Sequence, residues 1–291
     1  MLALVSLVAL VALLLPLPAW AAADAPVQDL HFDSGGLEIR YTVQGEGEPV
    51  VLVHGFTASV EANWGAPGII DVLAKDYRVI ALDARGHGKS SKPHDPAAYG
   101  IHMVEDVIRL MDHLGILKAH LAGYSMGGGI ALQALVTYPD RFYSVILGGA
   151  GWQPPGSGFQ AMMGVLADSL EQGKGLGPLI LALNPAGQPP PTAEQIAAAN
   201  ARLLATNDPL ALAAVIRGGA TNRQITADQL RANRVAILAV VGEIDPVKAG
   251  VDAMAGVASH LEVKVLPGKD HLTAVGDPEL AASMREFLLR H

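Results

Sequence analysis

The chain has 291 residues, of which 51% are hydrophobic and 16% are charged, a composition that argues against extensive disorder. The formal net charge of −8 and the lack of a basic run argue against a nucleic-acid-binding surface, because phosphate binding needs clustered Lys and Arg. The chain contains no cysteine, which excludes disulfides, thiolate nucleophiles and cysteine-ligated metals.

Residues 1–23 are predicted to be a signal peptide. The stretch 2–15 is apolar apart from Ser6, and small residues at 19, 21 and 23 supply A-x-A-like cleavage sites. This stretch is shorter than the about 20 residues of a membrane span. No basic residue precedes it, however, so an uncleaved N-terminal membrane anchor is the alternative. We expect an exported protein, periplasmic or secreted, whose mature part begins near residue 22 or 24 and then makes no stable membrane contact.

Beyond this leader, strand patterns follow one another along the chain. Residues 37–45 (LEIRYTVQG) alternate apolar and polar side chains, which predicts a half-exposed antiparallel strand. Six later segments contain continuous apolar runs, as strands buried on both faces of a parallel sheet do. These segments are PVVLVHGF (49–56), RVIALDARG (78–86), KAHLAGYS (118–125), FYSVILGGAG (142–151), VAILAVVGEID (235–245) and LEVKVLPGKDH (261–271).

Helical patterns separate the strands. Residues 103–114 place their apolar side chains on one helical face, and a terminal helix begins at Pro278. This alternation predicts an α/β fold: a mostly parallel, twisted sheet flanked by helices.

One long segment, 152–233, carries no strand signal. Its proline-rich turns are followed by Ala- and Leu-rich helical stretches such as 193–205. The periodicity favours a helical cap over a disordered insertion. We therefore predict a core formed by residues 24–151 and 234–291, with the cap inserted after the sixth strand.

The stretch LAGYSMGGG, residues 121–129, contains a G-x-S-x-G pattern centred on Ser125. In a strand-to-helix turn, flanking glycines allow close backbone approach and leave a strained serine exposed. A serine hydroxyl becomes a good nucleophile only when a base removes its proton, and a third group must orient that base.

Two later strand ends supply such groups. Asp245 follows one buried run and His271 follows the next. Catalytic groups in open α/β sheets gather at the carboxyl ends of the strands, so Ser125, Asp245 and His271 are the predicted catalytic residues. Glu243 and Asp270 are alternatives for the acid, but Asp245, followed by Pro246, is better placed in the loop.

Backbone N–H groups of Phe56 and Met126 are predicted to form an oxyanion hole, since Phe56 follows a buried strand and Met126 begins the helix after Ser125. His54 is expected to make structural hydrogen bonds. We expect His87, His94 and His102 to be surface histidines.

Within the cap, Trp152, Met162 and Met163 are candidate substrate-binding residues. The last two belong to an apolar set with few charges nearby, which suits an uncharged substrate group: Met162, Met163, Leu166, Leu179, Ile180 and Leu183. The alternative is that these side chains pack only the cap's own core.

Five segments, VVLVHGF, VIALDARGHGKS, LAGYSMGGGIAL, VVGEID and LPGKDH, occur in an order and spacing that resemble the α/β-hydrolase family over residues 37–291. The likeness is to the branch with a helical cap after the sixth strand, which includes esterases, haloperoxidase/perhydrolase-like enzymes and C–C bond hydrolases. The segment 83–90 looks like that family's D-x-R-G-x-G-x-S loop, a scaffold feature. Serine at position 125 differs from the aspartate that the similar epoxide hydrolases and dehalogenases carry there.

The resemblance implies a Ser-His-Asp hydrolase that acts on a small to medium, largely uncharged carboxylic ester, and it leaves C–C cleavage, lactone opening and perhydrolysis open. No cofactor or metal is expected, because no G-x-G-x-x-G follows a strand, no H-E-x-x-H occurs, and GKS at 88–90 lacks the P-loop's first glycine. A small molecule is the expected partner. The alternative from another class is a small-ligand receptor on the same fold, because fold does not determine function.

Overall fold

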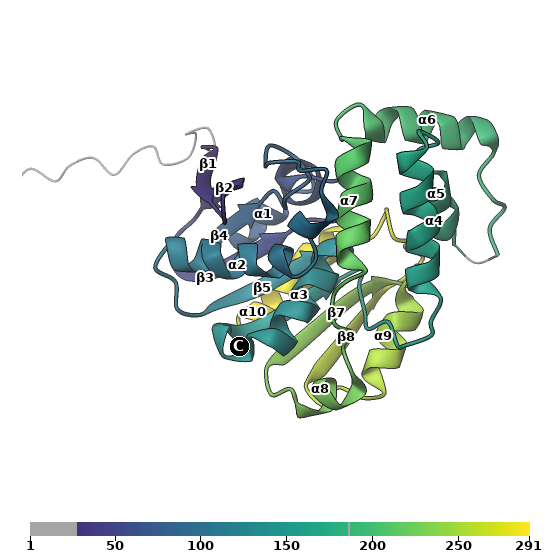
Figure 1. Ribbon diagram of the computed structural model, residues 1–291. Helices are drawn as coiled ribbons and strands as arrows, with labels where there is room; N and C mark the ends of the chain where they lie inside the picture. Colours follow the sequence, from purple (N-terminus) through teal and green to yellow (C-terminus); the bar gives the residue numbers. More distant parts are fainter. Residues whose placement is uncertain (1–27, 186) are drawn as a thin grey trace, which may run out of the picture.

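The computed structural model describes residues 28–185 and 187–291 (Figure 1). The predicted signal peptide lies outside these residues. Among the described residues, no helix combines the length and apolar character needed to cross a membrane.

Within the described ranges, eight strands form one sheet in the order β1-β2-β4-β3-β5-β6-β7-β8. The first two pair antiparallel with their neighbours, and the remaining pairs are parallel. The strands are β1 (Leu30–Asp33), β2 (Glu38–Gln44), β3 (Glu48–Val53), β4 (Tyr77–Leu82), β5 (Ala119–Tyr124), β6 (Phe142–Gly148), β7 (Ala236–Gly242) and β8 (Leu261–Leu266).

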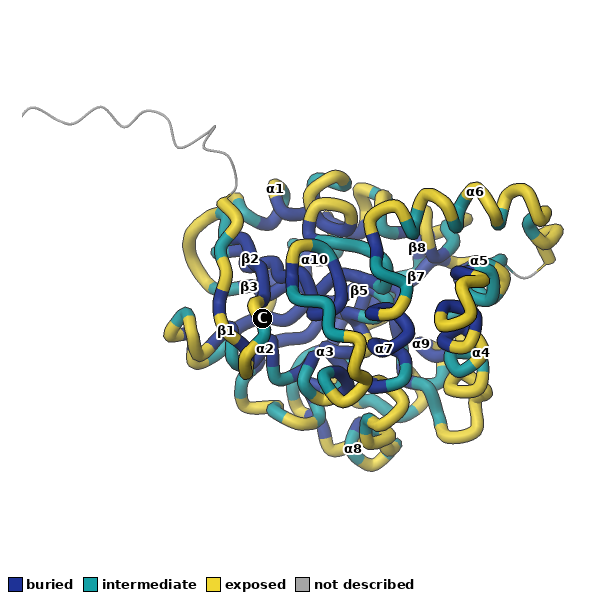
Figure 2. Tube along the Cα trace, turned by 45° about the horizontal axis from the view of Figure 1, so that its top comes forward, coloured by how far each residue is buried: buried dark blue, intermediate teal, exposed yellow. Residues whose placement is uncertain are grey.

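Helices cover both faces of this sheet, which explains why the central strands are continuous apolar runs. One face packs against α2 (Ile101–His113), α3 (Met126–Thr137) and α9 (Lys248–Ala255). The other packs against α1 (Ile69–Leu73) and α10 (Pro278–Leu288). Figure 2 shows the strands buried at the centre, with exposed residues on the outer helical surfaces. Short helical turns complete the core: η1 (Glu61–Gly65), η2 (Pro96–Ala98) and η3 (Pro139–Arg141).

Among the residues described between β6 and β7, five helices form: α4 (Phe159–Glu171), α5 (Gly177–Ala182), α6 (Ala193–Leu204), α7 (Pro209–Gly219) and α8 (Ala227–Ala232). The first four form a separate group beside the sheet in Figure 1, with α4 packed along α7. Their small apolar core includes Leu166, Leu170, Leu176 and Leu212. From here on, "the cap" means α4 to α7 and the loops between them.

The α/β sheet flanked by helices confirms the predicted fold class. Two details differ from the expectation. The strand β1 was not predicted, because its four residues (LHFD) are too few to show a period. The predicted cap boundary at residue 233 includes α8, yet α8 lies apart from α4–α7 in Figure 1, and its fully buried Leu230 packs in the main core.

Candidate active site

Ser125 sits at the turn between β5 and α3 with φ 52° and ψ −112°, a conformation that costs a non-glycine residue on the order of 1–3 kcal/mol. The glycines on either side make this turn possible. A Cβ at Gly123 would lie 2.0 Å from the Gly127 carbonyl oxygen, and a Cβ at Gly127 would lie 2.0 Å from that of Val53. The pattern around Ser125 therefore reflects backbone contacts that admit no side chain.

Three side chains from three strand ends form one hydrogen-bonded chain. The Ser125 Oγ lies 2.9 Å from His271 Nε2, and His271 Nδ1 lies 2.9 Å from Asp245 Oδ2. Asp245 and His271 are 3% and 4% exposed, so the hydrogen bond between them is buried, whereas the one between His271 and Ser125 is partly buried. With Nδ1–H donated to the carboxylate, Nε2 is left free to accept the serine proton.

The two alternative acids are engaged elsewhere. Glu243 accepts a hydrogen bond from the Gly268 N–H at 2.8 Å. Asp270 accepts from the N–H groups of Leu272 and Thr273 and stabilises its own turn. Asp245 is therefore the carboxylate that orients His271.

Tyr124, the residue before Ser125, holds the loop that carries His271. Its hydroxyl donates to the His271 carbonyl at 2.6 Å, and the two rings lie 5.6 Å apart. Burial raises the pKa of Tyr124, so the phenol remains a proton donor. Tyr124 was not predicted from the sequence, where its only signal is a tyrosine at the end of a buried strand.

The loop after β3 approaches the serine closely. An ideal Cβ on Gly55 would lie 3.4 Å from Ser125 Cβ. Within the described part of the chain, neither the Phe56 N–H nor the Met126 N–H donates a hydrogen bond to the protein. Both donors are thus free for a ligand oxygen, and their role in an oxyanion hole stays a prediction.

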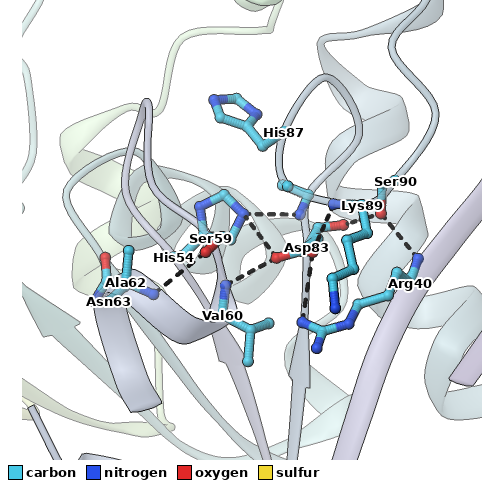
Figure 3. A network of polar contacts seen from close by, with 12 residues as sticks. Arg40, His54, Ser59, Val60, Ala62, Asn63, Asp83, His87, Lys89 and Ser90 are labelled. Carbon is cyan, nitrogen blue, oxygen red and sulfur yellow. Dashed lines mark hydrogen bonds and ion pairs between the residues drawn. The ribbon is translucent and has the colours of Figure 1, made fainter. Parts of the chain in front are cut away.

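Buried polar side chains hold this loop in place (Figure 3). His54 Nδ1 donates to the Gly55 carbonyl at 2.7 Å, and its Nε2 accepts from the Ala84 N–H at 3.0 Å. Asn63 Oδ1 accepts from the Gly55 N–H at 2.8 Å. Burial lowers the pKa of His54, which favours the neutral ring that these hydrogen bonds require. The predicted structural role of His54 is confirmed.

Asp83 links the same loop to the following one. Its carboxylate accepts from the N–H groups of Val60 and Lys89, each at 2.8 Å, and lies 3.5 Å from the Arg40 guanidinium (Figure 3). The side chain is fully buried. The D-x-R-G-x-G-x-S segment therefore has a scaffold role here.

The expectation that His87 is a surface residue is wrong. Its side chain is fully buried, with its ring 5.6 Å from Phe56 and 5.2 Å from His54. Burial lowers the pKa of His87 to about 3. The loop folds inward beneath α7, where Val215 approaches Gly86, a long-range contact that no local pattern reveals. By contrast, His94 is exposed and His102 half-exposed, paired with Asp208 and Glu105.

The candidate substrate-binding residues of the cap lie in two settings. Trp152 is buried in the main core, and its indole N–H donates to the Ile225 carbonyl at 2.8 Å, which joins the start of the insertion to its end. Met162 and Met163 are half-buried on α4, and Met163 packs with Phe56 against the cap's apolar core. Substrate contact by these residues stays a prediction.

Within the described residues, no group of three or more His, Asp and Glu side chains is arranged to hold a metal ion.

Residues 48–175 match the family model described as the alpha/beta hydrolase fold. The chain is 42% identical over 125 residues to the "Dihydrolipoyllysine-residue acetyltransferase component of acetoin cleaving system" of Cupriavidus necator. This match covers 43% of this chain and 32% of that protein. It is 36% identical over 120 residues to the "2-hydroxy-6-oxo-6-(2'-aminophenyl)hexa-2,4-dienoic acid hydrolase" of Metapseudomonas resinovorans, covering 40% of this chain and 41% of the relative. The matched segments thus span less than half the length of these relatives.

A solved structure matches over a larger share of the chain. The thermophilic esterase of Thermogutta terrifontis superposes with a TM-score of 0.73 at 26% identity, over 90% of this chain and 98% of that one. The sheet order, the strained turn at Ser125 and these likenesses agree: the described residues adopt the α/β-hydrolase fold, and residues 48–175 match its family model.

Proposed function

We propose that this protein is a serine hydrolase that cleaves a small to medium, largely uncharged carboxylic ester through an acyl-enzyme. The observation that carries the proposal is the Ser125–His271–Asp245 hydrogen-bond chain, with 2.9 Å at each link. Similarity to an esterase over 90% of the chain supports the same reaction class.

The proposed mechanism follows from these positions. His271 Nε2 takes the proton of the Ser125 hydroxyl as its oxygen attacks the ester carbonyl. The N–H groups of Phe56 and Met126 stabilise the negative oxygen of the tetrahedral intermediate, and the α3 dipole adds to this. His271 then protonates the leaving alcohol and activates a water that releases the acid, while Asp245 holds the imidazole tautomer.

The surroundings of the site favour an uncharged substrate. Residues 152–167 and 175–193 of the insertion contain no charged side chain. Ile244 and Leu272, next to Asp245 and His271, are exposed apolar residues at 38% and 68%. A charged acyl group would lose its hydration here without gaining a partner from these segments.

The test is a panel of esters, lactones, peracid-forming conditions and vinylogous diketones, combined with fluorophosphonate labelling of wild type and Ser125→Ala. We expect turnover of short-chain p-nitrophenyl esters, and covalent labelling that Ser125→Ala abolishes. If a diketone, a lactone or peroxide is turned over faster than the esters, that compound class is the substrate class instead. A wild type that binds these compounds but neither turns over nor is labelled would instead be a receptor on this fold.

We also propose that residues 1–23 direct export and are removed. The apolar stretch and the small residues at 19, 21 and 23 support this. N-terminal sequencing of protein recovered outside the cytoplasm should begin at Ala22 or Asp24. Met1 or Leu2 at the start of a membrane-bound protein would show the anchor instead.

A further inference from the structure

A residue of the cap reaches the loop that carries the proposed oxyanion donor. Thr57, directly after Phe56, has φ 63°, in the left-handed region that β-branched residues rarely adopt. Its carbonyl accepts a hydrogen bond from Asn207 Nδ2 at 3.0 Å. Asn207 lies between α6 and α7 and is 9% exposed, so this partly buried bond joins cap and core.

The surroundings of Asn207 determine which way its amide faces. Nδ2 also donates to the Leu203 carbonyl at 2.9 Å, and two carbonyl acceptors require the NH₂ group on this side. Among the described residues, no donor reaches the buried Oδ1. Donation through Nδ2 is therefore the polar contact that this side chain makes with the core.

The loop is held on both sides of Phe56. On the preceding side, His54 and Asn63 hold the carbonyl and the N–H of Gly55. On the following side, Asn207 holds the carbonyl of Thr57. The Phe56 N–H shares a peptide plane with the Gly55 carbonyl that His54 holds, and the backbone from Phe56 to Thr57 joins this plane to the carbonyl that Asn207 holds. A change of backbone angle at Thr57 would therefore shift the Phe56 backbone and tilt this plane.

We propose that Asn207 is a positioning residue: it keeps Thr57 in the left-handed conformation and thereby aims the Phe56 N–H at the oxyanion. The inference rests on the proposed function. Asn207 acts through Thr57 and does not touch the reacting atoms. The cap then contributes to the rate of the chemical step as well as to the choice of substrate.

A neighbouring contact offers a matched control. Asp208, the next residue, pairs with His94 of the core at 2.8 Å, so His94→Ala removes a cap-to-core contact without touching Thr57. In the full chain, Asn207→Ala and Asn207→Asp should lower kcat for p-nitrophenyl acetate and the rate of fluorophosphonate labelling by about 10-fold, less than the loss of a whole oxyanion donor. KM should stay within about two-fold, and His94→Ala should stay within about two-fold in kcat.

A second pair of variants separates positioning from simple stabilisation. Glycine adopts positive φ without strain, so Asn207→Ala in a Thr57→Gly background should lower kcat by less than about two-fold. An equal loss in both backgrounds, or a labelling rate equal to that of wild type in Asn207→Ala, would overturn the inference. If Asn207→Ala does not fold, as judged by thermal unfolding, Asn207→Asp has the same shape and gives the same comparison. A wild type that is neither active nor labelled would overturn the proposed function, and this inference with it.

Discussion

At the strand ends, the backbone itself is packed so closely that glycine is required at several positions, and the three polar side chains of the site are held from strands far apart in the sequence. The cap is organised differently. None of the residues described in α5 and α6 is buried, and the cap's core is a few leucines and alanines between α4 and α7. Rigid backbone thus positions the proposed chemistry, whereas side-chain packing, which tolerates substitution, forms the cover above it.

The largest effects are expected where the strand ends meet. His271→Ala should lower kcat by about 10⁵-fold or more, and Asp245→Asn by about 10⁴-fold, because a wrong imidazole tautomer cannot accept the serine proton. Glu243→Gln is the control, since its amide oxygen can still accept from the Gly268 N–H. Steady-state kinetics on an activated ester measures all three. A strong loss in Glu243→Gln with near wild-type rates in Asp245→Asn would show that the acid is misassigned.

Backbone crowding is tested by two glycines of one helix. Gly127→Ala places a methyl group 2.0 Å from the Val53 carbonyl oxygen, whereas Gly129→Ala meets nothing within 4 Å. We expect the first to lower the free energy of unfolding by about 2–3 kcal/mol. The second should raise it by about 0.5–1 kcal/mol, because alanine restricts the unfolded chain. Urea unfolding measures the free energy of unfolding of both variants. Equal changes in the two would mean that the turn at Ser125 has room for a methyl group.

His87 lies where core and cap meet, and it should make the fold sensitive to acid. Its pKa is about 3 in the folded state and about 6.5 when unfolded, so above pH 6.5 the ring is neutral in both states. Between pH 6.5 and 3, only the unfolded chain gains this proton. Stability should therefore fall by about 1.4 kcal/mol for each pH unit in that window.

The measurement is thermal unfolding of wild type and His87→Asn at pH 7.5 and pH 5. The decrease in Tm on acidification should be smaller in the variant, whatever its stability at pH 7.5. Parallel decreases would assign the acid sensitivity to other groups, such as the buried His54.

The smallest effect is expected from the cap. Met163→Ala removes a side chain from the apolar cluster that Phe56 also contacts, and it should change the ratio of kcat/KM between hexanoate and acetate esters by about 10-fold. Val165→Ala, on the same helix but 58% exposed, should leave that ratio unchanged. Fluorophosphonate labelling checks that Ser125 remains reactive in both. An unchanged ratio in Met163→Ala would mean that this side chain packs only the cap.

The parts of the site that were predictable depend on the chain's local order. Continuous apolar runs located the buried strands. Ser125, Asp245 and His271 were then selected because they follow such runs, and parallel strands bring their carboxyl ends to one edge of the sheet. The unpredicted parts depend on contacts between distant loops. The buried His87 follows Gly86, which Val215 of α7 approaches, and Asn207 meets Thr57 across 150 residues of sequence. Neither fact has a periodic or compositional signature.

The order of the sheet has a consequence for how activity is acquired. Ser125 follows β5, a central strand, whereas His271 follows β8 at the sheet's edge and lies 146 residues further along the chain. Under the proposed mechanism, Ser125 is synthesised long before His271, and we expect it to stay unreactive until the loop after β8 is in place. Detachment or cleavage of that edge strand would abolish the reactivity of Ser125 without changing Ser125 itself. Covalent labelling of Ser125 would therefore also serve as a readout of whether the outermost strand is in place.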